Sequence, residues 1–173
     1  DTDGMWHENF LRAKDLYVEV IEMLMPLGNV YVQFNDSNHD RMSGFFLAQT
    51  IEAWFRNSDI TFDVTMRPRK YFQYGVNLIG TSHGESKEAD LPLIMATECP
   101  EEWATSTKRY WYCHHIHHKK SKEYMGVCVE YLRSSSGTYG WHSRNGYLSN
   151  KALEAFVHDV QEGQVCRLTQ YIM

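Results

Sequence analysis

The chain has 173 residues and a formal net charge of −5 at pH 7. A single domain of this length buries roughly 70% of the surface that its unfolded form exposes. Hydrophobic residues make up 43% of the chain and aromatic residues 14%, which excludes a disordered protein. The acidic balance argues against broad, sequence-independent binding of nucleic acid, so any contact with nucleic acid would have to be local.

The cysteines and the hydrophobicity profile indicate a cytoplasmic protein. The four cysteines form no Cys-x-x-Cys pair and are interpreted as reduced thiols. No apolar stretch approaches the length of a membrane span, and residues 1–10 lack the basic and apolar regions of a signal peptide. We therefore expect no contact with a membrane.

The first part of the chain predicts two helices and a strand between them. Residues 5–25 carry apolar side chains at mostly helical spacing, with Asp3 as a candidate N-cap. Residues 29–34 form a β-branched and aromatic run bounded by turn formers, which predicts a buried strand. Residues 43–57 predict an amphipathic helix, with Ser43 as its candidate cap.

The middle of the chain predicts further strands, followed by two helices. Residues 60–66 alternate apolar and polar side chains, as a half-buried strand does, and residues 71–84 predict one or two strands more. Residues 88–98 predict a helix with Pro92 in its first turn. A second short helix is expected to begin at Cys99.

The last part of the chain predicts two strands, a long loop, a helix and a final strand. The strands are expected at 108–113 and 124–134, and the Gly- and Ser-rich residues 134–147 form the loop. A closing helix is expected at 150–160 and a strand at 165–172. The layout predicts one α/β domain, residues 1–173, with a mixed rather than a purely parallel sheet.

Three polar segments follow predicted strands, at residues 35–41, 80–85 and 113–118. Loops at strand ends are where α/β proteins build their sites. Each segment contains histidine, and the first also contains Asn and Asp. Imidazole, carboxylate and amide ligands together suit Zn, Mn, Fe or Ni better than Ca or Mg.

Four histidines gather in the third segment, at His114, His115, His117 and His118, with three lysines close behind. Considered alone, this cluster is open to three interpretations: a metal site, a solvated basic loop and a pH-sensitive interaction patch. In extended chain, residues two apart point the same way, which would place His115 and His117 on one side. Lys120 and Lys122 are interpreted as solvated loop residues.

The segments "SNHD" (37–40), "SHGE" (82–85) and "HHIH" (114–117) occur in an order that resembles the calcineurin-like metallophosphoesterases, in particular their bacteriophage-type, DNA-repair-exonuclease-like members. The resemblance implies a sandwich of mixed sheets flanked by helices. It covers the C-terminal portion of that family, so the N-terminal strands are expected to be missing and residues 1–173 to form a partial domain.

The resemblance assigns a role to each residue of the first motif. Asn38 matches an amide ligand of the second of two metals. His39 matches the histidine that contacts the scissile phosphate and protonates the leaving group. Asp40 would orient His39 by accepting its other N–H.

The later motifs supply the remaining metal ligands by the same resemblance. His83 and His115 match the two histidine ligands of the second metal, and His117 matches a ligand of the first. Arg41 and Lys119 are the candidate substrate-binding cations. The cofactors implied are two divalent ions, with Mn, Fe, Zn, Ni and Mg not distinguished.

Two departures from the family pattern bear on these assignments. Ser37 and His114 stand where the motifs have glycine, which usually serves the backbone torsions. Nothing before Asn29 matches the family's Asp-x-His and Gly-Asp motifs, which supply the other ligands of the first metal. We therefore expect either a fragment of a longer enzyme or a shortened form without the first half-site.

The expected function is a metal-dependent phosphoesterase, an enzyme if the missing motifs are supplied, with DNA, RNA or a small phosphoester as substrate. It would act in the cytoplasm, that of a host cell if the chain is phage-encoded, and a homo-oligomer is one form open to it. The alternative is a degenerate, non-catalytic module that binds metal or nucleic acid.

Overall fold

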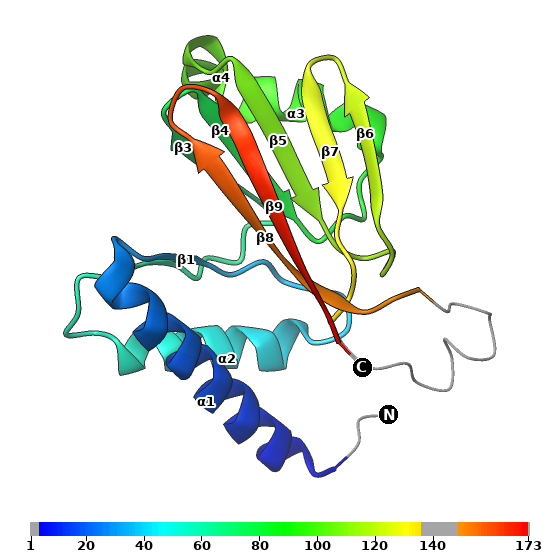
Figure 1. Ribbon diagram of the computed structural model, residues 1–173. Helices are drawn as coiled ribbons and strands as arrows, with labels where there is room; N and C mark the ends of the chain where they lie inside the picture. Colours follow the sequence, from blue (N-terminus) through cyan, green and yellow to red (C-terminus); the bar gives the residue numbers. More distant parts are fainter. Residues whose placement is uncertain (1–3, 136–148, 173) are drawn as a thin grey trace. The chain divides into compact units, whose positions relative to one another are not determined.

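The computed structural model describes residues 4–135 and 149–172 (Figure 1). The chain divides into two compact units, Asp1–Pro68 and Arg69–Met173. The expectation of a single domain over residues 1–173 stays a prediction. None of the helices in the described part of the chain is long and apolar enough to cross a membrane.

The first unit has two helices and a small parallel sheet. Helix α1 (Trp6–Leu24) continues into a short 3₁₀ turn, and helix α2 (Arg41–Trp54) lies between strands β1 (Tyr31–Gln33) and β2 (Thr61–Asp63). The two strands pair in parallel, as two strands connected through a helix can. The predicted helices and strands of this region are confirmed, but the strands are shorter than expected, and β1 is only partly buried, with Tyr31 exposed.

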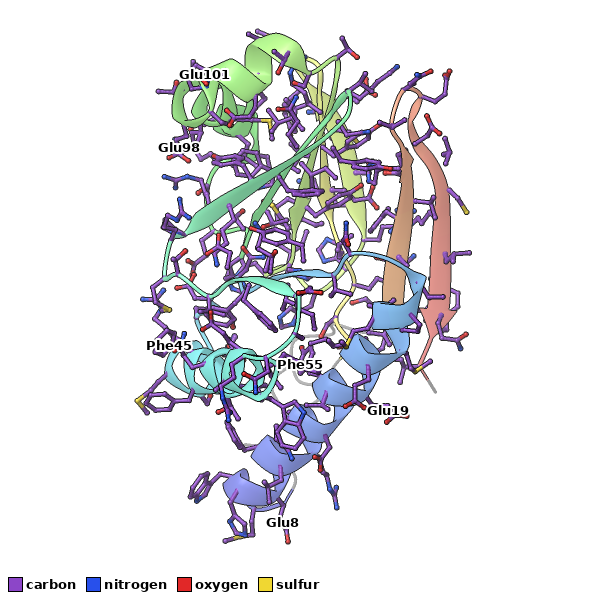
Figure 2. The ribbon with its side chains drawn as sticks, turned by 90° about the vertical axis from the view of Figure 1, so that its left-hand side faces the viewer. Glu8, Glu19, Phe45, Phe55, Glu98 and Glu101 are labelled. Atoms are coloured by element: carbon purple, nitrogen blue, oxygen red, sulfur yellow. The ribbon has the colours of Figure 1, made fainter. Side chains whose placement is uncertain are left out.

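The core of this unit follows from helical spacing. Val18 and Ile21 are three residues apart on α1, while Ile51 and Phe55 are four apart at the end of α2, so each pair shares one helix face. Burying side chains of this size contributes roughly 1.5–3 kcal/mol each. Figure 2 labels Phe55, together with Glu8 and Glu19 along α1.

The predicted cap of α2 is wrong. The helix begins at Arg41, so Asp40 is the N-cap residue and Ser43 lies inside the first turn. The Ser43 hydroxyl donates to the carbonyl oxygen of Asp40 at 3.2 Å. It therefore bonds within the first turn and does not cap the helix. Helix α1 is preceded by Met5, which offers no capping side chain, and the predicted cap Asp3 lies outside the described residues.

The second unit contains a five-stranded mixed sheet. Its strands are β3 (Arg69–Tyr74), β4 (Asn77–Ser82), β5 (Lys108–Cys113), β6 (Lys120–Tyr124) and β7 (Val127–Tyr131). They are arranged in the order β3-β4-β5-β7-β6. The three central strands are parallel, and each edge strand is antiparallel to its neighbour. The predicted mixed α/β class is thereby confirmed.

Helices cover one face of this sheet, because parallel β4 and β5 require a crossover connection. The crossover comprises a 3₁₀ turn, helix α3 (Leu91–Glu98) and helix α4 (Pro100–Thr105), and Pro92 lies in the first turn of α3 as predicted. Met95 of α3 and Trp111 of β5 are fully buried in the same cluster, and the Trp111 indole N–H donates to Ser82 Oγ at 2.9 Å.

The predicted closing helix at 150–160 is wrong. Strands β8 (Ala152–Asp159) and β9 (Gly163–Tyr171) form an antiparallel hairpin, of which only the second strand was expected. Exposed and partly buried residues alternate along β8 with the two-residue period of a strand. Phe156 is one of the inward residues, and its ring stacks on Tyr112 of β5 with centroids 4.5 Å apart.

The hairpin covers the sheet face opposite α3 and α4, so the second unit is a layered α/β structure (Figure 1). Neighbouring residues of a strand point to opposite faces, and Trp111 and Tyr112 do so on β5. The Tyr112 hydroxyl lies 2.9 Å from both His158 Nε2 and Gln164 Oε1 of the hairpin. Figure 2 shows Glu98 and Glu101 on the helices of the other face.

His158 makes the stability of this unit depend on pH. Its ring lies between the Tyr112 hydroxyl and Asn77 Oδ1, next to the Tyr110 ring, and burial lowers its pKa from the ordinary 6.5. The unfolded chain therefore takes up the proton first as the pH falls. Stability from this group is complete above pH 6.5 and declines below it.

We expect urea unfolding of the wild type to show this loss as the pH falls below 6.5. His158→Gln keeps a hydrogen-bonding side chain and removes the titration, so its unfolding free energy should change less over the same range. Identical pH dependence in the two proteins would contradict the assignment.

The sequence pattern does not predict strand β6, and Lys120 and Lys122 belong to this strand instead of a loop. Lys120 forms an ion pair with Glu88 at 2.5 Å, and Lys122 lies over the Tyr124 ring. Lysine is common on edge strands because it discourages pairing with another chain. Here a lysine-rich strand resembles a polar loop in sequence.

Candidate metal centre

The candidate site lies where the parallel strands β4 and β5 end side by side. His83 is the first residue after β4, and His115 follows β5 by two residues. The strands pair in register up to Thr81 and Tyr112, so their carboxyl ends meet at one edge of the sheet. The fold therefore brings together the second and third polar segments, as the sequence predicts.

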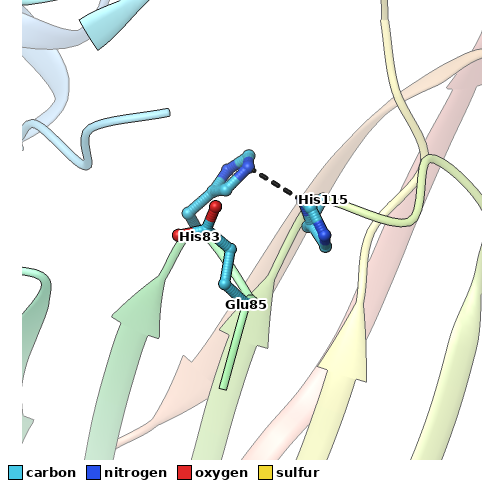
Figure 3. A group of neighbouring side chains, drawn as sticks. All are labelled: His83, Glu85 and His115. Atoms are coloured by element: carbon cyan, nitrogen blue, oxygen red, sulfur yellow. Dashed lines mark hydrogen bonds between the residues drawn. The ribbon is translucent and has the colours of Figure 1, made fainter. Parts of the chain in front are cut away.

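Three side chains converge at this edge (Figure 3). His83 Nε2 lies 3.1 Å from His115 Nδ1, and the two rings meet edge to face with centroids 4.9 Å apart. A carboxylate oxygen of Glu85 completes the group, with all three potential ligand atoms within 4.8 Å of one another. Both histidines are partly buried, whereas Glu85 is exposed.

The spacing of the two nitrogens fits a shared metal ion. With metal–nitrogen bonds of about 2.0–2.1 Å, two ligands of a tetrahedral ion lie roughly 3.3–3.4 Å apart, and neighbouring ligands of an octahedral ion about 3 Å apart. The 3.1 Å separation falls between these values. Two imidazoles and one carboxylate are a donor set suited to transition metals such as Zn, Fe and Mn.

The same nitrogens can also share a hydrogen bond, with one ring donating and the other accepting. In that arrangement the accepting nitrogen carries no proton, and a ring nitrogen without a proton is the form that binds a metal. Loading the site would then exchange one N–H···N contact for two metal–nitrogen bonds. The pair is thus close to the arrangement that metal binding requires.

Backbone contacts join the two loops that carry these residues. The His114 N–H donates to the carbonyl oxygen of His83 at 3.0 Å, which extends the contact between β4 and β5 beyond the strands. Gly84 has a φ of +110°, in the region that favours glycine, and its Cα faces Cys113 and Tyr131. Burial raises the pKa of the Cys113 thiol to about 11, so this sulfur is protonated at neutral pH.

The expectation that His115 and His117 lie in extended chain is wrong. Both have left-handed backbones, with φ of 51° and 59°, and the Ile116 N–H closes a tight turn onto the carbonyl oxygen of His114 at 2.6 Å. Histidine adopts this region more readily than most residues with a side chain. His117 is not part of the His83–Glu85–His115 group, and its role as a metal ligand stays a prediction.

Ser37 and His114, which replace the motif glycines, do not adopt the left-handed backbone that would strain a residue other than glycine. Neither Ser37 nor His114 has a positive φ, and the left-handed residues of the third segment are instead His115 and His117. Ser37 also accepts a hydrogen bond from the His39 N–H at 3.2 Å. These two departures from the family pattern are therefore compatible with the local backbone.

The first motif lies in the other unit, in the turn before α2. Asn38 and His39 belong to this turn, and Asp40 is the N-cap residue of the helix, with its carboxylate close to Gly44. The roles assigned to these residues by resemblance stay predictions.

The two candidate substrate-binding cations differ in their surroundings. Arg41 Nε lies 3.0 Å from an Asp36 carboxylate oxygen, whereas Lys119 is exposed at the end of the histidine loop. Among the other cations of the second unit, Arg69 binds Glu98 through two nitrogens and Lys120 pairs with Glu88. The substrate-binding roles of Arg41 and Lys119 stay predictions.

Glu85 was missed as a potential ligand, although the segment "SHGE" contains it. The His-x-Glu spacing after a strand could have indicated Glu85 as a second potential ligand, because both side chains follow the same strand end. Sequence could not establish that the Gly84 torsion brings the carboxylate back beside His83. The structure adds this residue to the candidate set.

No protein-family model matches the chain, and no curated protein matches it significantly. Among solved structures, it is similar to the crystal structure of Vps29 from Chaetomium thermophilum. The TM-score is 0.40 at 12% sequence identity, over 87% of this chain and 85% of Vps29. At this level of similarity, no property of Vps29 can be carried over to this chain.

Proposed function

We propose that the chain is a metal-dependent phosphoesterase whose metal is held by His83, Glu85 and His115. The observation that carries the proposal is the convergence of these three side chains at one end of the parallel strands. A divalent ion bound there would lower the pKa of a coordinated water toward neutral and polarise a phosphoryl oxygen. Three protein ligands leave coordination positions for water and substrate.

Each ligand contributes differently to this site. The two neutral imidazoles fix the position of the site, because both follow strands whose register is set by the sheet. Glu85 supplies the only negative charge of the three and so lowers the net charge of a divalent site to about +1. It is also the ligand most open to solvent.

The finer parts of the proposal rest on the sequence resemblance. By that resemblance, the substrate would be a phosphodiester of DNA or RNA, as for the phage-type members. Asn38 would add an amide ligand, His39 would protonate the leaving group, and Asp40 would orient His39. Arg41 and Lys119 would bind the phosphate charge.

Hydrolysis of bis-(p-nitrophenyl) phosphate tests this function directly. The purified chain should hydrolyse it when supplied with Mn²⁺, Zn²⁺, Co²⁺ or Ni²⁺, and a chelator should abolish the activity. His39→Ala should retain the bound metal and lose turnover, since histidine at this position is proposed as the acid. A chain that binds metal and hydrolyses no phosphoester would contradict the enzymatic reading.

A non-catalytic metal-binding module is the second candidate. It is favoured by the composition of the site, because the described residues of the second unit provide three converging ligands, which suffice for one ion. Two ions about 3.5–4 Å apart, as in binuclear hydrolases, need further ligands between them. Metal analysis distinguishes the candidates: one ion per chain without turnover supports the module.

A further inference from the structure

Tyr131 lies directly behind the loop that joins two of the three candidate ligands. It is the last residue of β7 and is only 3% exposed. Its hydroxyl donates to the carbonyl oxygen of Gly84 at 3.2 Å. Gly84 separates His83 from Glu85, so this contact holds the peptide between the two ligands.

The ring of Tyr131 also packs against the same peptide. A Cβ on Gly84 would lie 2.9 Å from Tyr131 Cε1 and 3.1 Å from Cys113 Cβ, closer than side chains normally approach. The Gly84 backbone is thus seated on the two side chains. The hydrogen bond from the tyrosine then fixes how this peptide is rotated.

Two consecutive carbonyl groups of the ligand loop are therefore held from different strands. The His83 carbonyl accepts from the His114 N–H at the end of β5, and the Gly84 carbonyl accepts from Tyr131 at the end of β7. Glu85 follows immediately and has an exposed side chain. Its carboxylate reaches the histidines only while the preceding peptide keeps its orientation.

We propose that Tyr131 is a positioning residue of the metal centre, acting through the Gly84 carbonyl to keep Glu85 beside His83 and His115. The inference rests on the proposed function, since it requires that these three residues bind metal. Groups that orient ligands without touching the metal typically change its affinity about 10- to 100-fold. Loss of the hydroxyl should therefore weaken metal binding and leave the fold intact.

Titration with Co²⁺ alone tests the proposal. Tyr131→Phe should raise the dissociation constant about tenfold and shift the visible Co²⁺ absorption, because the carboxylate ligand is displaced. Tyr124→Phe is the matched control: it removes a partly buried hydroxyl of the same sheet that donates to Glu88 at 2.9 Å. This control should bind Co²⁺ as the wild type does, and both metal-free variants should unfold at similar temperatures.

Each outcome has a definite meaning. If Tyr131→Phe binds Co²⁺ with the affinity and spectrum of the wild type, the positioning role is overturned. If its metal-free form loses its fold by circular dichroism, the hydroxyl supports the unit as a whole and the proposal is also overturned. A wild type that binds no Co²⁺ would instead refute the metal centre itself, and with it the proposed function.

Discussion

His115→Ala is expected to weaken Zn²⁺ binding by more than about 100-fold, because the loss of a direct ligand should exceed the 10- to 100-fold effect of groups that only orient ligands. The two remaining candidate ligands, His83 and Glu85, come from one short loop. A metal bound to the variant would therefore no longer connect this loop to the end of β5. Isothermal titration of the metal-free protein with Zn²⁺ measures the change.

The matched control is His118→Ala. His118 lies three residues further along the same loop, is exposed, and directs Nδ1 to the carbonyl oxygen of Ile116 at 2.8 Å. The same substitution there removes an imidazole without touching the three-residue group, so Zn²⁺ affinity should stay near that of the wild type. Equal losses in both variants would point to loose binding by the histidine-rich loop as a whole.

Thermal unfolding provides a second readout for the same pair. A ligand present at 100 times its dissociation constant stabilises the native state by about 2.7 kcal/mol. Zn²⁺ should therefore raise the unfolding temperature of the wild type and of His118→Ala, and should have little effect on His115→Ala. Stabilisation of His115→Ala to the wild-type extent would place the metal elsewhere.

The position of the site could be predicted from sequence because strand ends are recognisable. His83 and His115 each follow a run of apolar and aromatic residues, and the carboxyl ends of neighbouring parallel strands meet at one sheet edge. That reasoning needs no knowledge of loop torsions. It therefore identified the two histidines whose location depends on the strands.

The residues whose location depends on the loops could not be predicted in the same way. Glu85 joins the group through the torsion of Gly84, and His117 departs from it because His115 and His117 both adopt left-handed backbones. Glycine at position 84 and histidine at 115 and 117 permit these angles, but nothing local in the sequence requires them. The extended chain assumed for residues 114–118 was the simplest geometry, and the tight turn at Ile116 replaces it.

The β8–β9 hairpin is a further case in which local sequence and the rest of the fold favour different structures. Residues 151–155 (Lys-Ala-Leu-Glu-Ala) are all good helix formers, and this local preference predicts the wrong element. Strand β8 pairs with the following strand β9 along its length, and its inward side chains contact a residue distant in sequence: Tyr112 stacks on Phe156 and contacts His158. Tertiary contacts therefore outweigh helix propensity in this segment.

Arg167→Ala is expected to destabilise the second unit by about 3–5 kcal/mol, the usual effect of removing one partner from a buried ion pair. Arg167 of β9 donates to Glu130 of β7 and, at 2.5 Å, to Glu154 of β8. The side chains of Glu130 and Glu154 are only 6% and 1% exposed. Urea unfolding of the variant and the wild type measures the difference.

The control is Lys120→Ala, which removes a cation from an exposed ion pair of the same unit. Water and salt screen such a pair, so this variant should stay close to the wild type. Comparable destabilisation by both substitutions would show that the buried ion pairs contribute no more stability than the exposed one.

The pH dependence of the stability lost in Arg167→Ala distinguishes an effect of charge from an effect of packing. Burial alone would raise the pKa of Glu154, but its hydrogen bonds and charge interactions with Arg167 and, to a smaller extent, with Arg133 leave that pKa below the ordinary 4.5. In the wild type, this contribution is present above pH 4.5 and is lost as the pH falls through the folded-state pKa. Without Arg167, Glu154 keeps Arg133 as its remaining cation, so its pKa should rise and it should take up a proton at a higher pH than in the wild type. The unfolding free energy lost in Arg167→Ala should therefore be largest near neutral pH and smaller in acid. A loss of packing alone would be the same at neutral and at acid pH.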